Sequence, residues 1–286
     1  MPVQPASRPP LDRDRLAASE GWRYEVTEAS PSTNAEVAAR FREGEQPGLA
    51  LVTEHQTAGR GRLDRTWLTP PRAALTVSFL LAADEVPVGR WPWLPLIAGV
   101  AVVAAVRRTA PTVATATGLK WPNDVLCEDR KLAGILLERV EHASSTGSRA
   151  AAVVGIGINV SQAPEELPVE TATSLAVEGV GDLDRTGLLL ALGDELAARV
   201  AAWTAVGGEP ASVRSSYLSL CRTIGRRVRV ELPGQLPVEG EALDVDADGR
   251  LVLRTAAGEQ RVGAGDVVHV RPGGAQGGSA SGHRDA

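Results

Sequence analysis

The chain contains little cysteine, little histidine and no excess of positive charge. Its 286 residues include two cysteines, Cys127 and Cys221, which show neither metal-ligand spacing nor the framework of a small disulfide-rich domain. The four histidines are also scattered, without ligand spacing. A formal net charge of −5 argues against a broad basic surface for nucleic acid or anionic membrane. Any basic site must therefore be local, and the cysteine content suits a reducing cytoplasm.

Long apolar runs are also missing. The most apolar stretch, from Trp93 to Val106, is shorter than the roughly 20 residues that cross a membrane, so it predicts a buried helix. The first ten residues carry several prolines and lack the apolar core of a signal peptide. We therefore expect a disordered leader at residues 1–19, no export and no membrane partner. The motifs of Walker phosphate loops, serine hydrolases and protein kinases are absent as well.

The spacing of apolar residues predicts a protein that combines helices with a sheet. Thr33 and Glu36 have the spacing of a capping box, which places the start of a helix at Thr33. Further helices are expected at residues 93–106, 186–206 and 210–221. Strands are expected at residues 22–26, 49–53, 75–81, 119–121, 125–127, 133–140 and 151–158. The short connections between several of these strands favour antiparallel pairing.

The pattern changes beyond Gly225. Short strands separated by turn signals are expected at residues 228–231, 239–245, 251–255, 259–262 and 267–270. This density of strands predicts a small β-barrel, whereas the final GGAQGGSASGHRDA lacks the apolar content to pack. We therefore divide the chain into a main domain at residues 20–222, a small barrel at 223–272 and a disordered tail at 273–286.

A short segment between two expected strands concentrates positive charge. It runs from Thr57 to Trp67 and reads TAGRGRLDRTW. Its glycines let backbone amides approach an anion, and its arginines offer forked donors for carboxylate or phosphate. Trp67 provides a flat face on which a base could stack. The segment predicts an anion-binding loop, and a basic surface loop that contacts RNA has the same composition.

Two further motifs lie at the ends of expected strands. In KWPND, at residues 120–124, Lys120 could neutralise a phosphate, or it could be a surface lysine beside a core tryptophan. In GIGIN, at residues 155–159, the third glycine of a dinucleotide fingerprint is missing. Asn159 could bond a ligand there, or the glycines could serve close backbone packing.

Taken in order, these motifs resemble those of the biotin protein ligase family. The chain contains STN at 32–34, QTAGRGR at 56–62 followed by Arg65 and Trp67, KWPND at 120–124, KLAGI at 131–135 and GIGIN at 155–159. The resemblance covers roughly residues 20–272 and implies an α+β fold. That fold has a mixed, mainly antiparallel sheet packed with helices, as in class II synthetases, and a small C-terminal SH3-like β-barrel.

The resemblance also implies the chemistry and the residues that carry it. Family members use ATP, with Mg²⁺, to activate biotin as biotinyl-5′-AMP, which they transfer to a lysine of a biotin carboxyl carrier domain of acyl-CoA carboxylase. We therefore expect a biotin-[acetyl-CoA-carboxylase] ligase whose arginine loop closes over the adenylate. The residues expected to bind biotin are Ser32, Thr33, Asn34, Gln56, Gly59, Arg60, Gly61, Arg62 and Lys120. Those expected to bind ATP are Arg65, Trp67, Asn123 and Asn159, and those expected to act in catalysis are Arg60, Arg62 and Lys120.

Other interpretations of the sequence stay open. A lipoate-type protein ligase would use the same adenylation chemistry, and an RNA-binding module would use the arginine loop with Trp67 as a stacking platform. Asp124 is a candidate to orient or deprotonate the acceptor lysine. Too few residues precede Trp22 for a three-helix DNA-binding domain, so we expect no operator binding. The oligomeric state, monomer or homodimer, is left undecided.

Overall fold

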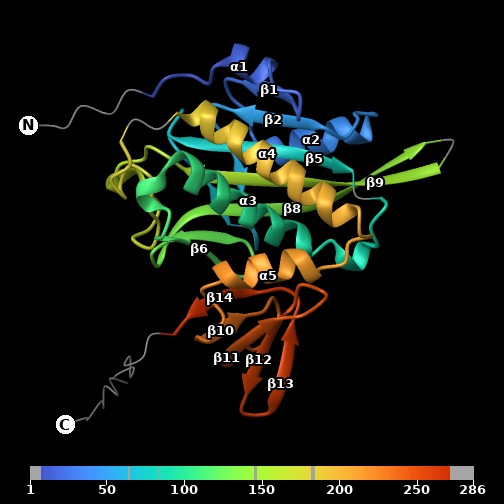
Figure 1. Cartoon of the computed structure of the whole chain (residues 1–286), viewed down its shortest axis with the longest axis vertical. Coiled ribbons are helices and arrows are strands. Elements are labelled where there is room, and N and C mark those ends of the chain that lie inside the picture. Colours follow the sequence, from blue (N-terminus) through green and yellow to red (C-terminus); the bar gives the residue numbers. More distant parts are fainter. Residues whose placement is uncertain (1–7, 64, 83, 145–146, 182–183, 271–286) are drawn as a thin grey trace, which may run out of the picture.

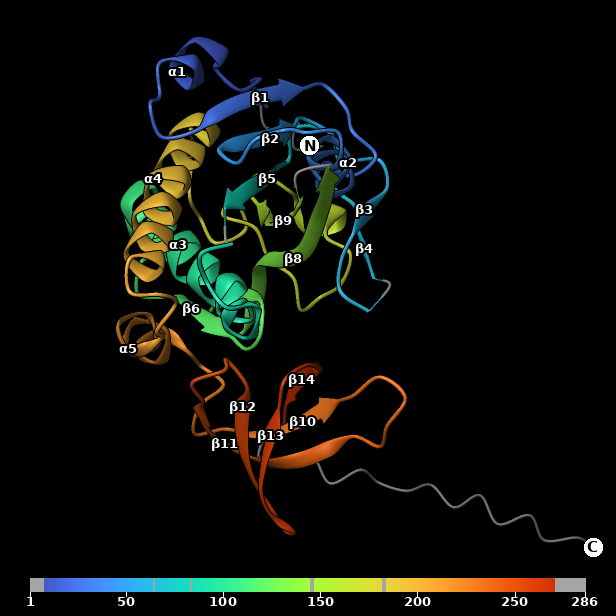
Figure 2. The same cartoon turned by 90° about the vertical axis from the view of Figure 1, so that its right-hand side faces the viewer.

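The larger part of the protein is a seven-stranded sheet with helices on both faces (Figure 1, Figure 2). This computed structural model describes residues 8–63, 65–82, 84–144, 147–181 and 184–270. β1 and β2 run parallel, and the other neighbouring pairs run antiparallel, which confirms the expected mixed, mainly antiparallel sheet. The order across the sheet is β1 (Arg23–Thr27), β2 (Leu49–Thr53), β5 (Ala74–Ala82), β9 (Gly147–Asn159), β8 (Arg130–Ser144), β7 (Asp124–Cys127) and β6 (Thr117–Lys120).

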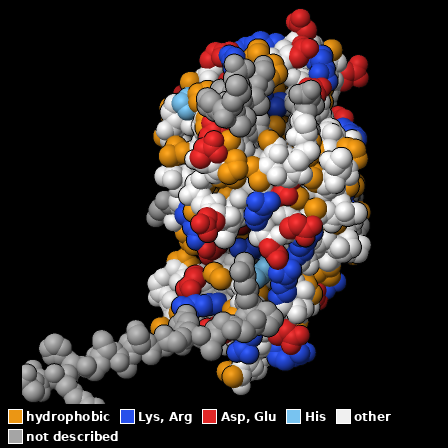
Figure 3. Space-filling view, turned by 90° about the vertical axis from the view of Figure 1, so that its left-hand side faces the viewer, with side chains coloured by type: hydrophobic (Ala, Val, Ile, Leu, Met, Phe, Trp, Pro, Cys, Tyr) orange, Lys and Arg blue, Asp and Glu red, His pale blue; other side chains and the backbone are white. Residues whose placement is uncertain are grey.

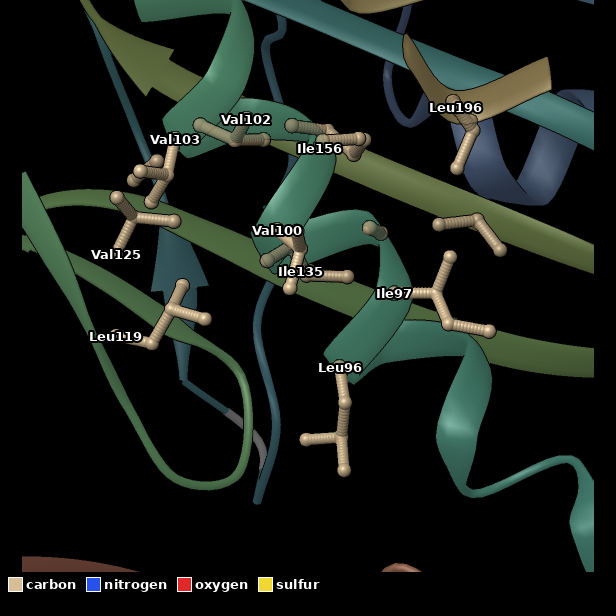
Figure 4. Packing of buried hydrophobic residues seen from close by; sticks show 14 of the residues in the cluster. Leu96, Ile97, Val100, Val102, Val103, Leu119, Val125, Ile135, Ile156 and Leu196 are labelled. Atoms are coloured by element: carbon tan, nitrogen blue, oxygen red, sulfur yellow. The ribbon is translucent and has the colours of Figure 1, made fainter. Parts of the chain in front are cut away.

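Helices α3 (Trp93–Thr109) and α4 (Arg185–Thr204) cover one face of this sheet. Val100 of α3 lies beside Ile135 of the sheet, and Val103 lies beside Val125 (Figure 4). Helix α3 is apolar on all sides because the sheet and α4 enclose it, which confirms the predicted buried helix. Among the described residues, no helix is both long enough and apolar enough to cross a membrane.

Helix α2 (Thr33–Arg42) lies on the opposite face and covers only part of it. Its N-cap is Ser32, whose hydroxyl accepts a hydrogen bond from the Ala35 amide at 3.4 Å. The predicted capping box is therefore displaced by one residue. Glu36 accepts a hydrogen bond from the Ser30 hydroxyl at 3.0 Å instead of closing the box.

A second, antiparallel sheet of five strands follows helix α5 (Ala211–Leu220) and lies below the first in Figure 1. Among the described residues β13 and β14 form its edges, so the expected SH3-like barrel is observed as an antiparallel sheet. Two indoles join it to the main part: Trp93 Nε1 donates to Ala247 O at 2.9 Å, and Trp121 Nε1 to Gly249 O at 3.0 Å. Its order is β13 (Gly258–Val262), β12 (Leu251–Thr255), β11 (Val238–Val245), β10 (Arg227–Glu231) and β14 (Asp266–His269).

The expected disordered leader is wrong for residues 8–19. Leu11 and Leu16 are buried, and the Leu11 amide donates to Glu54 Oε1 at 2.7 Å. Glu54 also forms a buried ion pair with Arg185 at 2.8 Å. Two leucines and an N-capping aspartate give this segment enough burial and hydrogen bonding to pack, despite its prolines. The expected tail at 273–286 lies outside the described residues.

Short elements complete the chain. A two-stranded hairpin stands apart from both sheets and carries most of the arginine segment. The short elements are α1 (Arg13–Ala17), β3 (Gly59–Arg60), β4 (Thr66–Trp67), and the 3-10 turns η1 (Val88–Arg90), η2 (Pro111–Val113) and η3 (Pro164–Glu166).

Charged side chains are mixed on the visible surface. On the face shown in Figure 3, acidic and basic side chains are interspersed instead of gathering by sign. Ion pairs such as Arg130 with Glu178, at 2.8 Å, bring opposite charges together. That face therefore offers no broad basic patch of the kind that nucleic acid contacts.

Candidate active site

On the part of the sheet face that α2 leaves uncovered, three neighbouring positions carry no side chain. Successive residues of a strand point to opposite faces, and Gly134, Gly155 and Gly157 occupy positions on this face. Farther along the same face, Leu80 and Val153 fill the space beneath α2. The three glycines form the floor of a cavity that the arginine segment covers.

The glycines allow two larger side chains to approach the sheet closely. A Cβ on Gly157 would lie 2.5 Å from the ring of Trp67, and one on Gly155 would lie 2.2 Å from Asn34 Oδ1. Both distances are below van der Waals contact, so only glycine admits these neighbours. Trp67 thereby lies flat against the cavity, with its Nε1 hydrogen unpartnered among the described residues. The glycines of GIGIN thus line the cavity and admit close packing of Trp67 and Asn34, and they do not form a dinucleotide turn.

The first turn of α2 forms the polar end of the cavity. The lining there includes four residues that the family resemblance assigns to biotin: Ser32, Thr33, Asn34 and Gln56. The Thr33 amide donates to Gln56 Oε1 at 3.0 Å. Ser78 Oγ lies 2.7 Å from Thr33 Oγ1 and 2.6 Å from Asn34 Oδ1. A helix N-terminus and this connected set of hydroxyl and amide groups suit a neutral polar ligand group with both donors and acceptors.

Residues 59–63 and 65–67, which we call the flap, cover the cavity from above. Gly61 lines it, whereas Gly59 lies in the hairpin against Trp67 and does not. The three arginines of the flap all line the cavity, and each contacts a different part of the protein. Arg60 pairs with Glu138 of β8 at 3.2 Å, Arg62 donates to Asn123 Oδ1 at 3.0 Å, and Arg65 forms an ion pair with Asp266 of β14.

Lys131 is the lysine that the structure brings to the cavity. Its Nζ lies 2.6 Å from Asp124 Oδ1 and 6.0 Å from the centre of the Trp67 ring. Burial lowers the pKa of the nearby Arg62, and the charges of Asp124 and Asp266 oppose that effect. The cavity therefore has a cationic wall in which Lys131 and Arg62 face the same enclosed space.

The expectation that Lys120 shares this cavity with Arg60 is not met. Lys120 lies on β6, the edge strand, one strand beyond Asp124, and it does not line the cavity. Its charge acts instead on His269 of the C-terminal sheet, whose pKa falls to about 4 through burial and then through repulsion from Lys120 and Arg226. Sequence reasoning assigned the lysine at the strand end, whereas the lysine of KLAGI reaches the site. The KLAGI motif at residues 131–135 could have identified Lys131, because it is one of the motifs that resemble those of the family.

Asn159 and Asn123 differ in their placement. Asn123 lines the cavity and is fixed by Arg62 and by its own bond to Ile135 O at 2.8 Å. Asn159 does not line it, because its side chain donates to Thr173 O and accepts from Gln162, both at 2.9 Å. The nucleotide-binding role expected of Asn159 stays a prediction.

The acidic residues of the cavity are the candidate ligands for the expected Mg²⁺. Asp124 and Asp266 line the cavity, and each is paired with a cation of the protein. Within the described ranges, no group of three or more His, Cys, Asp or Glu side chains could hold a metal ion. These residues fit Mg²⁺ only as an ion held mainly by nucleotide phosphates, with one carboxylate as a further ligand.

The comparisons with known proteins agree with this geometry. Residues 25–159 match the model of the biotin/lipoate A/B protein ligase family, and residues 223–270 match the biotin protein ligase C-terminal domain. Over 271 residues the chain is 44% identical to the biotin–[acetyl-CoA-carboxylase] ligase of Mycobacterium tuberculosis, covering 92% of this chain and 97% of that relative. This chain belongs to the biotin protein ligase family.

Solved structures of the family have the same fold. The biotin protein ligase of Aquifex aeolicus, in complex with biotin and ATP, superimposes with a TM-score of 0.68 at 28% identity, covering 87% of this chain and 98% of that one. The Leishmania major biotin protein ligase, in complex with biotinyl-5-AMP, gives a TM-score of 0.57 at 26% identity, covering 84% of this chain and 98% of that one. A bifunctional ligase/repressor of Bacillus subtilis is 33% identical over 77% of this chain and 66% of that relative.

Proposed function

We propose that this biotin protein ligase activates biotin with ATP as biotinyl-5′-AMP and transfers it to a lysine of a carrier domain of acyl-CoA carboxylase. The observation that carries the proposal is the meeting of the polar turn of α2, the glycine floor, the flap and Lys131 around one cavity. The match to relatives named biotin–[acetyl-CoA-carboxylase] ligase supports it.

In the first step, a biotin carboxylate oxygen attacks the α-phosphorus of ATP, and pyrophosphate leaves. The polar groups of Thr33, Asn34 and Gln56 bind the ureido ring, which offers one acceptor and two donors. Lys131 and Arg62 then neutralise the charge where carboxylate and phosphate approach each other, a contribution of several kcal/mol from fixed cations. Mg²⁺, when bound to the ATP phosphates, supplies further neutralisation of the same kind.

In the second step, the amine of the acceptor lysine attacks the activated carbonyl, an amide forms and AMP leaves. The attacking ammonium must first lose a proton. Asp124 is the carboxylate placed for that task, beside Lys131 and inside the cavity. The flap keeps water from the acyl-adenylate until the acceptor arrives.

The test is exchange of labelled pyrophosphate into ATP with biotin or lipoate as the acid. Biotin-dependent exchange, followed by transfer of biotin to a purified carrier domain, is the expected result. Exchange that requires lipoate would show that lipoate, and not biotin, is the acid that the protein activates. Exchange with neither acid would reject adenylation as the activity.

A further inference from the structure

Glu138 is a charged residue of the sheet that the chemistry above does not use. It lies on β8, on the same face as Gly134, and its carboxylate is partly buried at the edge of the cavity. It accepts hydrogen bonds from two residues that do line the cavity. Asn34 Nδ2 donates to Glu138 Oε1 at 3.1 Å, and Arg60 Nη2 donates to the same oxygen at 3.2 Å.

One carboxylate thus joins the first turn of α2 to the flap. Asn34 is 5% exposed and Arg60 is largely exposed, so a buried amide and an exposed guanidinium bond to the same carboxylate. Arg60 has only this carboxylate as an ion-pair partner among the described residues. Without it, the long arginine side chain would sample many rotamers over the cavity.

The charge of Glu138 also fixes the orientation of the Asn34 amide. An amide has a donor end and an acceptor end, and an anion accepts bonds only from the donor end. With Nδ2 held by Glu138 and by Leu136 O at 3.3 Å, Oδ1 must face Ser78 Oγ, 2.6 Å away. The carboxylate therefore sets the direction of the hydrogen bonds that continue through Ser78 to Thr33.

We propose that Glu138 is a positioning residue for biotin: it orients the Asn34 amide at the ureido end and holds Arg60 over the cavity. This inference rests on the proposed function and names a residue that acts through two others. Glu138 belongs to the part of the site that binds biotin. Replacing it therefore weakens binding of biotin and retention of the adenylate more than binding of ATP.

The experiment compares Glu138→Gln with Glu141→Gln in biotin-dependent pyrophosphate exchange. Glu141 lies on the same strand, is exposed and pairs with Arg139, so it is a matched control. We expect Glu138→Gln to raise the KM for biotin about tenfold, the scale of one lost charged hydrogen bond. The KM for ATP and the maximal rate stay close to those of the parent protein. The rate at which labelled biotinyl-5′-AMP leaves the protein rises as well.

The outcomes separate the possibilities. An unchanged biotin KM and release rate in folded Glu138→Gln protein would overturn the proposal, as would a fall in maximal rate with both KM values unchanged. If Glu138→Gln does not fold, Glu138→Asp keeps the charge at a shorter reach and is expected to raise the biotin KM by a smaller factor. An unchanged biotin KM in Glu138→Asp would then overturn the proposal. Absence of biotin-dependent exchange in the parent protein would instead reject the proposed function.

Discussion

Lys131 and Lys120 are close in sequence but lie on different strands, β8 and β6, with β7 between them. Both lie in a hairpin-rich part of the sheet, and Asp124 is near each of them. Lys131 pairs with Asp124 inside the cavity, whereas Lys120 lies on the outer strand toward His269. Electrostatic stabilisation requires a charge fixed close to the reacting atoms, so the proposed mechanism uses Lys131 and not Lys120.

The two lysines therefore respond differently to truncation. We expect Lys131→Ala to reduce biotin-dependent pyrophosphate exchange by at least about a hundredfold, since loss of one preorganised donor has that effect. Lys120→Ala, its matched control, leaves exchange within about threefold, because a rim charge contributes little to chemistry. Exchange assays on both variants decide the matter. A severe loss in Lys120→Ala with normal Lys131→Ala would reverse the assignment.

At the scale of elements, the flap is held by three different neighbours. Glu138 belongs to the main sheet, Asn123 to the turn before β7, and Asp266 to the C-terminal sheet. The contact with Asp266 is the most exposed of the three, because the Arg65 side chain is more exposed than those of Arg60 and Arg62. The C-terminal sheet therefore takes part in closing the cavity.

Neutralising Asp266 tests this contact. We expect Asp266→Asn to speed the release of biotinyl-5′-AMP and to increase cleavage of the flap by trypsin, because Arg65 loses its anion. Stability should hardly change, since exposed ion pairs contribute little to it. Glu259→Gln on β13, which removes a surface ion pair with Arg261, serves as the control. Equal release rates for both variants would show that the C-terminal sheet does not restrain the flap.

Most elements follow from sequence patterns, and the exceptions have physical reasons. Strand β2 is an almost continuous apolar run because it is buried along its whole length, and β5 departs from such a run at Thr76 and Ser78, which lie on the face of the cavity. The first turn of α2 and the flap also lie where their motifs predict. The position of Lys120 depends on strand order, which periodicity does not reveal. The packing of residues 8–19 depends on a distant partner, Glu54.

At the scale of the whole molecule, the two sheets meet around His269. Its Nε2 lies 3.2 Å from Thr223 Oγ1 and its Nδ1 lies 3.4 Å from Arg226 Nη1. Burial, followed by the positive charges of Lys120 and Arg226, lowers the pKa of His269 to about 4, against a weaker opposing effect of Asp129. The imidazole is therefore neutral in the folded protein at neutral pH.

This shift makes stability depend on pH in a defined window. The folded pKa of about 4 lies below the ordinary value of 6.5, so the unfolded chain binds the proton more readily. The free energy of unfolding should fall as the pH drops from about 6.5 toward about 4. Urea unfolding at several pH values, with His269→Gln and His142→Gln compared, measures the effect. We expect His269→Gln to flatten the profile, and a slope equal to that of the parent would contradict this origin.

The glycine floor has a consequence for which molecules the protein accepts. The shape of the cavity depends on missing side chains, because three residues of two adjacent strands are glycines. Adding a methyl group at Gly157 would push the indole of Trp67 outward and shrink the space from below. Enlarged vitamin analogues are therefore expected to gain their room from above, by loosening the arginine-bearing hairpin, because these three positions have no side chain left to remove.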